Sequence, residues 1–187
     1  MNLSEFNNLT DLFFYQAEKQ KPKSIFLEWL NPNNKKKFTW SDTSSNIYKF
    51  AKILKENIIE GDRCLLVSEN RPEWLISDIA VMLANGITVP AYTTYTEKDY
   101  EYLIEDCQPS VVIISNEEIH NKLKNIISKK IFIKKVITFE KIHGVNYKNK
   151  YLEFSSIIRN DLLESDKIKK YLHGQKHHQI FINLLKF

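Results

Sequence analysis

The chain has 187 residues, of which 43% are hydrophobic and 12% aromatic, and its formal net charge at pH 7 is +4. This length suggests about one domain, and the apolar content is too high for an intrinsically disordered chain. The lysines are scattered or in short runs without a known nucleic-acid-binding motif, which favours solvated surfaces over a nucleic-acid interface.

The first part of the chain predicts a helix, a β-hairpin and a second helix. Apolar residues at helical spacing predict a helix over Leu9–Lys19, which Pro22 ends. Two short runs, Ser24–Leu30 and Lys36–Trp40, flank an Asn-Pro-Asn-Asn turn and predict a hairpin. Ser41 is the expected N-cap of the next helix. The apolar face of that helix consists of Ile47, Phe50, Ala51, Leu54 and Ile58.

The middle of the chain predicts a strand, a buried helix and a second strand. Cys64–Val67 is a continuous apolar run, as in strands covered on both faces. Asn70 fits a helix N-cap, with Glu73 reaching back to close a capping box. Gly86 is expected to end the helix, and Pro90 to end the second strand. These elements form a βαβ unit, whose crossover should be right-handed.

The alternation of helix and strand continues along the chain. Thr96 and Asp99 predict a capping pair that opens a helix, and Pro109 ends it. The next predicted elements are a strand at Ser110–Ile114, a helix at Glu117–Ser128 and a strand at Lys135–Phe139. We therefore predict an α/β fold with a mostly parallel sheet flanked by helices. Leu152–Leu163 is expected to hold a short strand or helix, and an irregular tail follows.

Two short segments carry a resemblance to a known family. Residues 69–74 read Glu-Asn-Arg-Pro-Glu-Trp, and residues 85–92 read Asn-Gly-Ile-Thr-Val-Pro-Ala-Tyr. They resemble the N-terminal part of AMP-forming long-chain acyl-CoA synthetases, which belong to the adenylate-forming superfamily. The resemblance keeps its order from about Leu12 to about Phe139. It departs from the family at Asn85, where a glycine is common, and at Thr93, where a proline is frequent.

The resemblance implies the N-terminal subdomain of an adenylate-forming enzyme at residues 1–170, followed by a tail at 171–187 without a family counterpart. It also implies a long-chain fatty-acid–CoA ligase, which makes an acyl-adenylate from a fatty acid and ATP and then passes the acyl group to CoA. Full-length members use Mg²⁺ and a Ser/Thr/Gly-rich loop, followed by Pro-Lys-Gly, that surrounds the ATP phosphates with N–H groups.

No such phosphate loop is present in this sequence, because its four glycines, Gly61, Gly86, Gly144 and Gly174, are well separated. We therefore assign no catalytic, cofactor-binding or metal-binding residue, and we expect this fragment to be inactive alone. Residues after about Lys170 are interpreted as out-of-frame translation of a truncated gene.

Two other functions stay open. The chain could be a binding module that complements a separately encoded remainder of the ligase, or an unrelated doubly wound nucleotide-binding domain. The absence of a Gly-rich turn after the first buried strand argues against the latter.

Several groups of residues have both a structural and a functional interpretation. Glu69, Arg71 and Glu73 could form a charged site at the end of a strand, but ion pairing and capping are favoured. His173, His177 and His178 have spacing that could ligate zinc, but an exposed tail is favoured. A third group is assigned to core and rim packing, with an acyl pocket as the alternative. It consists of Tyr92, Tyr95, Tyr100 and Tyr102. Trp74 is interpreted as a core anchor.

The sequence also indicates where the protein resides. Cys64 and Cys107 form no disulfide framework and are interpreted as reduced core residues. No apolar run is long enough to cross a membrane, and the first residues do not begin a signal peptide. We therefore expect a soluble, cytoplasmic protein.

Overall fold

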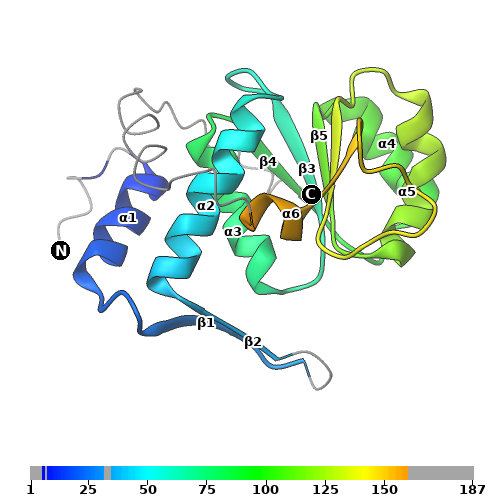
Figure 1. Ribbon diagram of the computed structural model, residues 1–187. Helices are drawn as coiled ribbons and strands as arrows, with labels where there is room; N and C mark the ends of the chain where they lie inside the picture. Colours follow the sequence, from blue (N-terminus) through cyan, green and yellow to red (C-terminus); the bar gives the residue numbers. More distant parts are fainter. Residues whose placement is uncertain (1–5, 7, 32–34, 160–187) are drawn as a thin grey trace.

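The structure, a computed structural model, describes residue 6 and residues 8–31 and 35–159. The chain begins with helix α1 (Leu9–Lys19), the hairpin strands β1 (Ile25–Trp29) and β2 (Lys36–Thr39), and helix α2 (Trp40–Lys55). As predicted, β1 and β2 pair in antiparallel fashion, and the hairpin extends away from the body of the protein (Figure 1).

The centre of the molecule is a parallel sheet of five strands in the order β4-β3-β5-β6-β7. Its strands are β3 (Arg63–Val67), β4 (Ile87–Ala91), β5 (Val111–Ile114), β6 (Lys135–Thr138) and β7 (Tyr151–Glu153). The predicted α/β fold with a parallel sheet is therefore confirmed. The segment expected to form a strand or a helix contains both, because β7 leads directly into the short helix α6 (Phe154–Ile158).

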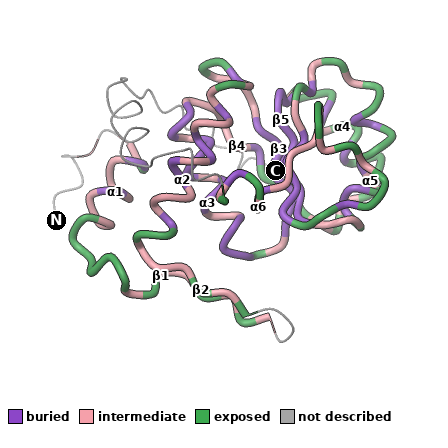
Figure 2. Tube along the Cα trace, in the orientation of Figure 1, coloured by how far each residue is buried: buried purple, intermediate pink, exposed green. Residues whose placement is uncertain are grey.

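Helices cover both faces of the sheet (Figure 1). On one face, α2, α6 and α3 (Pro72–Leu83) pack against one side of the strands in a first core cluster. On the other face, α4 (Glu97–Cys107) and α5 (Glu117–Lys129) enclose a second core cluster. The strands β3 and β5 between them are almost wholly buried (Figure 2), as their continuous apolar runs predict.

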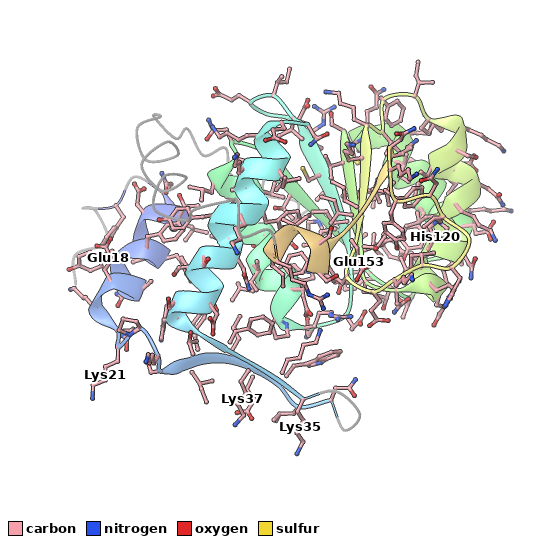
Figure 3. The ribbon with its side chains drawn as sticks, viewed as in Figure 1. Glu18, Lys21, Lys35, Lys37, His120 and Glu153 are labelled. Carbon is pink, nitrogen blue, oxygen red and sulfur yellow. The ribbon has the colours of Figure 1, made fainter. Side chains whose placement is uncertain are left out.

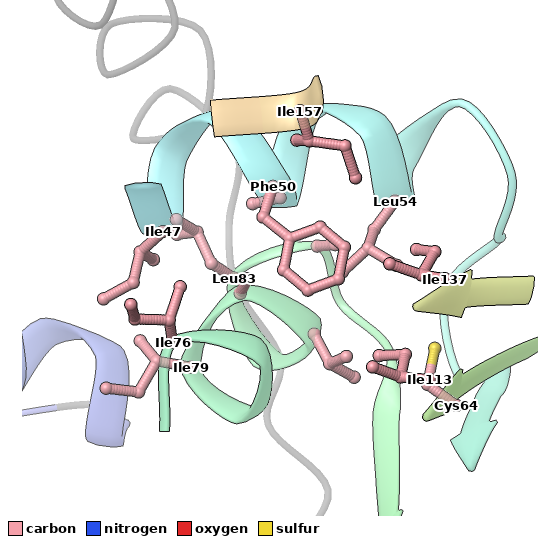
Figure 4. Close-up of a cluster of buried hydrophobic side chains, with 14 of the residues drawn as sticks. Ile47, Phe50, Leu54, Cys64, Ile76, Ile79, Leu83, Ile113, Ile137 and Ile157 are labelled. Carbon is pink, nitrogen blue, oxygen red and sulfur yellow. The ribbon is translucent and has the colours of Figure 1, made fainter. Parts of the chain in front are cut away.

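The first core cluster is built around the apolar stripe of α2. Ile47, Phe50, Ala51 and Leu54 are all fully buried, as the helical spacing predicts. Figure 4 shows Phe50 between the helices and the sheet, with Ile157 of α6 above it and Ile137 of β6 beside it. The rings of Phe50 and Phe154 meet edge-to-face at a centroid distance of 5.4 Å.

The helix caps agree with the sequence at α4 and differ at α2. At α4, Thr96 and Asp99 form the predicted capping box. At α2 the N-cap is Thr39, two residues before the predicted Ser41, and Asp42 completes its capping box. An N-cap residue typically has extended backbone, and Thr39 has that conformation as the last residue of β2.

The turn after α3 depends on two residues, Asn85 and Gly86, although Gly86 alone is predicted to end the helix. Asn85 adopts the left-handed conformation at φ 65°, which asparagine tolerates better than most residues. Gly86 instead allows close packing, since a Cβ atom there would lie 2.8 Å from the Cδ1 atom of Ile58. The Asn-Gly departure from the usual pair of glycines therefore fits the observed backbone.

Pro90 does not end its strand, contrary to the prediction. It lies inside β4, opposite Leu66 of β3. The N–H of Ile87 donates to the carbonyl of Asp62. Alternate residues of β4 therefore direct their backbone N–H and C=O groups toward β3, and the backbone groups of position 90 point away from it. Because β4 is the edge strand, the missing N–H of Pro90 removes no ladder bond.

Candidate functional site

The carboxyl ends of the parallel strands are where open α/β sheets bind ligands, at the point where the strand order reverses. In this sheet the reversal lies between β3 and β5, since α3 leaves β3 on one face and α5 leaves β5 on the other. Ser68 and Ser115 directly follow these two strands. The hydroxyl of Ser115 is fully buried and has no hydrogen-bond partner within the described part of the chain.

Arg71 occupies the α3 side of this edge. It is the N-cap residue of α3, and its side chain is only 1% exposed. The guanidinium lies over the ring of Trp29 at 4.5 Å and over that of Phe139 at 5.4 Å. These two aromatic rings come from the hairpin and from the end of β6, so Arg71 joins three parts of the fold.

Three carboxylates hold the Arg71 guanidinium in place. Its Nε donates to Glu73 Oε2 at 3.0 Å, and a terminal nitrogen donates to Glu73 Oε1 at 3.3 Å. The other terminal nitrogen donates to Glu140 Oε1 at 2.8 Å and to Glu69 Oε1 at 3.2 Å. Burial alone would lower the pKa of Arg71, but the bonds to Glu73 and Glu140 outweigh it and raise that pKa.

Glu73 is the second buried charge of this cluster. Its side chain is 3% exposed, and Lys36 of β2 donates to its Oε1 atom at 2.7 Å. Burial would raise the pKa of Glu73, but the hydrogen bonds from Arg71 and Lys36 and the charge of Arg71 lower it overall. We call these residues the Arg71 cluster: Lys36, Glu69, Arg71, Glu73 and Glu140.

The sequence interpretation of this region is partly wrong and partly confirmed. Asn70 and Glu73 form no capping box, because Arg71 is the N-cap and no side chain caps the helix. Glu73 instead accepts hydrogen bonds from the buried Arg71 and from the partly exposed Lys36. The pairing of Arg71 with Glu69 is confirmed. Lys36 and Glu140 were not singled out, since neither lies near Arg71 in sequence.

The Arg71 cluster is better suited to holding parts of the fold together than to binding an anion. Every Arg71 nitrogen already donates to a carboxylate, and three carboxylates outnumber two cations. A phosphate approaching this edge would meet excess negative charge. The cluster therefore acts as a clamp that fastens the hairpin and the end of β6 to the start of α3.

The charge of Glu73 makes the clamp sensitive to acid. A carboxylate whose pKa is lower in the folded chain contributes stability above its unfolded pKa, and this is lost as the pH falls through the folded value. The usual pKa is 4.5. We therefore expect the free energy of unfolding, measured in urea, to fall more steeply between about pH 6 and about pH 3 in the wild type than in Glu73→Gln. The exposed Glu28→Gln serves as control, and equal slopes for all three proteins would contradict the prediction.

The tyrosines predicted to pack together do so only in part. The ring of Tyr95 contacts Tyr92 and Tyr100, at centroid distances of 5.6 and 5.8 Å. Tyr100 is fully buried, and its hydroxyl donates to the carbonyl of Tyr92 at 2.7 Å. Tyr92 and Tyr102 are each 72% exposed. Core packing therefore holds for Tyr100, while Tyr102 lies on the surface.

Trp74, predicted to be a core anchor, is partly buried against the first core cluster.

The cysteines and histidines complete the set of predicted residues. Cys64 is fully buried and Cys107 half-buried, and both are free thiols. Burial raises the pKa of Cys107 to about 11, so that thiol stays protonated at neutral pH. Within residues 8–31 and 35–159, no group of three or more His, Cys, Asp or Glu side chains could hold a metal ion. The three histidines considered as zinc ligands lie outside the described residues.

A family profile decides what this chain is related to. The profile described as "AMP-binding enzyme" matches residues 13–162, most of the chain. The chain belongs to the AMP-binding enzyme family. The match covers the hairpin, the whole parallel sheet and the Arg71 cluster, so all of these are parts of an AMP-binding domain.

Curated relatives of this AMP-binding chain are acyl-CoA synthetases. A long-chain-fatty-acid–CoA ligase of Bacillus subtilis is 31% identical over 134 residues, which is 71% of this chain and 22% of the relative. A mitochondrial acyl-coenzyme A synthetase of Homo sapiens is 26% identical over 139 residues, 67% of this chain and 24% of the relative. The chain thus spans about a quarter of the length of these curated relatives.

Solved structures share the fold of this AMP-binding chain. An anthranilate CoA ligase in complex with anthranoyl-AMP has a TM-score of 0.71 at 20% identity, covering 85% of this chain and 30% of that one. The acetoacetyl-CoA synthetase of Streptomyces lividans has a TM-score of 0.72 at 13% identity, covering 82% and 25%. The predicted N-terminal subdomain of the adenylate-forming fold is thereby confirmed. Within the described residues, no helix is both long and apolar enough to span a membrane.

Proposed function

We propose that this chain supplies the N-terminal α/β unit of a long-chain fatty-acid–CoA ligase. The family match over residues 13–162 carries the proposal. Among the two curated relatives described, the long-chain ligase has the higher identity, 31% against 26%, which favours a long-chain fatty acid. The complete ligase would join fatty acid to CoA through an acyl-adenylate, using ATP with Mg²⁺.

The described residues do not fit the ATP phosphates. Phosphoryl chemistry needs unpaired cations and N–H donors where negative charge develops. The buried cation at the carboxyl edge of the sheet, Arg71, is already neutralised by three carboxylates. The sequence also has no Ser/Thr/Gly-rich phosphate loop. We therefore propose that the chain contributes structure to the ligase and no catalytic groups. We also propose that it is not an unrelated doubly wound nucleotide-binding domain, because it belongs to the AMP-binding enzyme family.

The chain alone is expected to form no acyl-CoA. The purified protein would be incubated with ATP, Mg²⁺, CoA and palmitate, and both pyrophosphate release and acyl-CoA formation would be measured. The Bacillus subtilis ligase under the same conditions is the positive control. ATP-dependent acyl-CoA formation by the 187-residue chain would contradict the proposal, because it would require phosphate-binding groups that we do not find.

A second candidate function is a binding module that complements a separately encoded remainder of the ligase. The edge strand β7 favours it. The N–H of Val136 donates to the carbonyl of Lys150 at 2.8 Å, so Leu152 faces β6 while the backbone groups of Tyr151 and Glu153 face outward. In the described part of the chain no strand covers that side, and open edges accept further strands.

Mixing experiments test the complementation. The chain would be combined with the Bacillus subtilis ligase from which the matching segment has been deleted. Co-elution in size-exclusion chromatography, together with acyl-CoA formation by the mixture alone, supports the second function. A monodisperse monomer that co-elutes with no such fragment excludes it.

Two further expectations belong to this proposal. We propose that residues 171–187 have no family counterpart. Reading the DNA past codon 170 in all three frames tests this, because a Ser/Thr/Gly-rich stretch and Pro-Lys-Gly in another frame would identify a frameshifted synthetase gene.

We also propose a cytoplasmic location, supported by the free thiols. Cell fractionation tests that location, since the human relative is described as mitochondrial.

A further inference from the structure

The amino-terminal edge of the sheet carries an unusual surface loop. From the last residue of α5 to the first residue of β6 the chain reads Lys-Lys-Ile-Phe-Ile-Lys-Lys, and we call these residues, 129–135, the basic loop. Ile131 at its centre is 97% exposed, the largest exposure among the exposed large hydrophobic residues of the described chain. Ile133 is buried and Phe132 packs against the second core cluster. The loop is thus anchored by two apolar residues and presents the third to solvent.

Positive charge surrounds Ile131. Six lysines belong to the basic loop or to the turn that enters the neighbouring strand β7: Lys129, Lys130, Lys134, Lys135, Lys148 and Lys150. The ammonium of Lys135 reaches the carbonyl of Asn149, and that of Lys150 donates to the carbonyl of Ile127 at 2.9 Å. These bonds tie the two turns together, and carbonyl acceptors leave the lysine charges uncompensated.

Only part of this charge is neutralised by carboxylates. Lys130 pairs with Glu105, and Lys134 lies 3.5 Å from Asp62. Lys129 and Lys148 are exposed, and no carboxylate pairs with either of them in the described part of the chain. The surface around Ile131 therefore keeps a net positive charge at neutral pH.

A second exposed isoleucine lies at the same end of the sheet. Ile59, in the turn between α2 and β3, is 71% exposed. Both turns lead into parallel strands, so both lie at the upper edge of the molecule in Figure 1. Strands β3 and β6 are separated only by β5, which places their starts about 10 Å apart. Glu60 beside Ile59 is acidic, so the positive charge is concentrated around the basic loop.

We propose that this edge docks on the surface of an anionic lipid bilayer, with the basic loop in the headgroup region and Ile131 inserted among the acyl chains. Lysines near an anionic membrane each strengthen binding about fivefold. An exposed aliphatic side chain adds affinity by leaving water for the acyl boundary. Nucleic acid would also attract the lysines, but it offers Ile131 no apolar environment, and the one aromatic residue of the loop, Phe132, packs against the second core cluster instead of presenting its ring for stacking on bases.

Vesicle cosedimentation of the 187-residue protein tests the docking. Wild-type protein should sediment with vesicles that contain phosphatidylglycerol and much less with vesicles of phosphatidylcholine alone. Binding should weaken when salt is raised, because salt screens exposed charges. Ile131→Ser should lower the partition coefficient at least about threefold, and Lys129→Gln about fivefold.

Matched controls come from the opposite part of the molecule. Figure 3 shows Lys21 projecting from the hairpin side of the protein, away from the basic loop. Lys21→Gln and Leu30→Ser remove one exposed lysine and one 72% exposed apolar residue there, and both should bind as the wild type does. Far-UV circular dichroism should be the same for all four variants.

Fluorescence reports whether position 131 enters the bilayer. Ile131→Trp should keep binding and show a blue-shifted emission that brominated lipids quench, in excess of any change in the three native tryptophans. Equal binding to both vesicle types, or unchanged binding of Ile131→Ser, overturns the proposal. Binding to duplex DNA with no affinity for vesicles also overturns it and assigns the lysines to nucleic acid.

Discussion

Replacing Arg71 by leucine is expected to lower the free energy of unfolding by about 3–5 kcal/mol. The guanidinium is buried and donates to three carboxylates, of which Glu73 is itself only 3% exposed. Without Arg71, Glu73 keeps a single cation, Lys36, and the charge of its second oxygen is buried without compensation. Urea denaturation followed by circular dichroism measures the loss, which is large beside a typical total stability of about 5–15 kcal/mol.

Two further variants separate the buried charge from lost packing. Adding Glu73→Gln to Arg71→Leu should recover part of the stability, because it removes the uncompensated carboxylate. Lys37→Ala breaks the exposed pair that Lys37 and Glu28 form at 3.0 Å, and it should cost less than about 1 kcal/mol. A cost for Arg71→Leu no greater than that for Lys37→Ala would mean that the Arg71 cluster does not hold the hairpin and the sheet together.

Replacing Phe50 by alanine is expected to cost about 3–5 kcal/mol. Phe50 is fully buried in the first core cluster, where its ring contacts that of Phe154. It projects from α2, which has extensive contacts with α3 and also meets α6. The resulting cavity would lie where three helices meet the sheet, a place where the backbone has little room to collapse.

Two controls separate the loss of buried volume from the loss of an aromatic ring. Phe50→Leu retains most of the buried volume and should cost less than half as much as Phe50→Ala. Tyr102→Ala removes an aromatic ring that is 72% exposed, and it should change the free energy of unfolding by no more than about 0.5 kcal/mol. Similar losses for Phe50→Ala and Tyr102→Ala would contradict the position of Phe50 in the core.

Local patterns predicted most of the fold because the forces that set them act over a few residues. The bounds of α1 agree with the prediction at both ends, and Thr96 caps α4 through a partner three residues away. The α2 cap was placed too late because the serine at 41 and the threonine at 39 have similar capping side chains. Which of them caps depends on where the extended backbone of β2 stops, and this is set by pairing with β1.

The Arg71 cluster could not be predicted in the same way. The sequence offered Glu73 a local role as the closing residue of a capping box, and this role was wrong. Tertiary contacts prevailed because burial makes an uncompensated carboxylate costly, and two cations are within reach. The partners Trp29, Lys36 and Glu140 approach Arg71 only once the hairpin has folded over α3 and β6 has paired with β5.

The strand order of the sheet has a consequence for the way the chain folds during synthesis. Once β3 and β4 have paired across α3, each later strand joins the strand that preceded it on the growing side: β5 beside β3, β6 beside β5, and β7 beside β6. No strand has to be inserted between two strands that are already paired. A ribosome releases the chain from its N-terminus at about 5–20 residues per second, and domains fold in that direction. The sheet can therefore be assembled in the order in which it is translated, with β5 adding to the open side of β3 and each later strand adding to the strand translated before it.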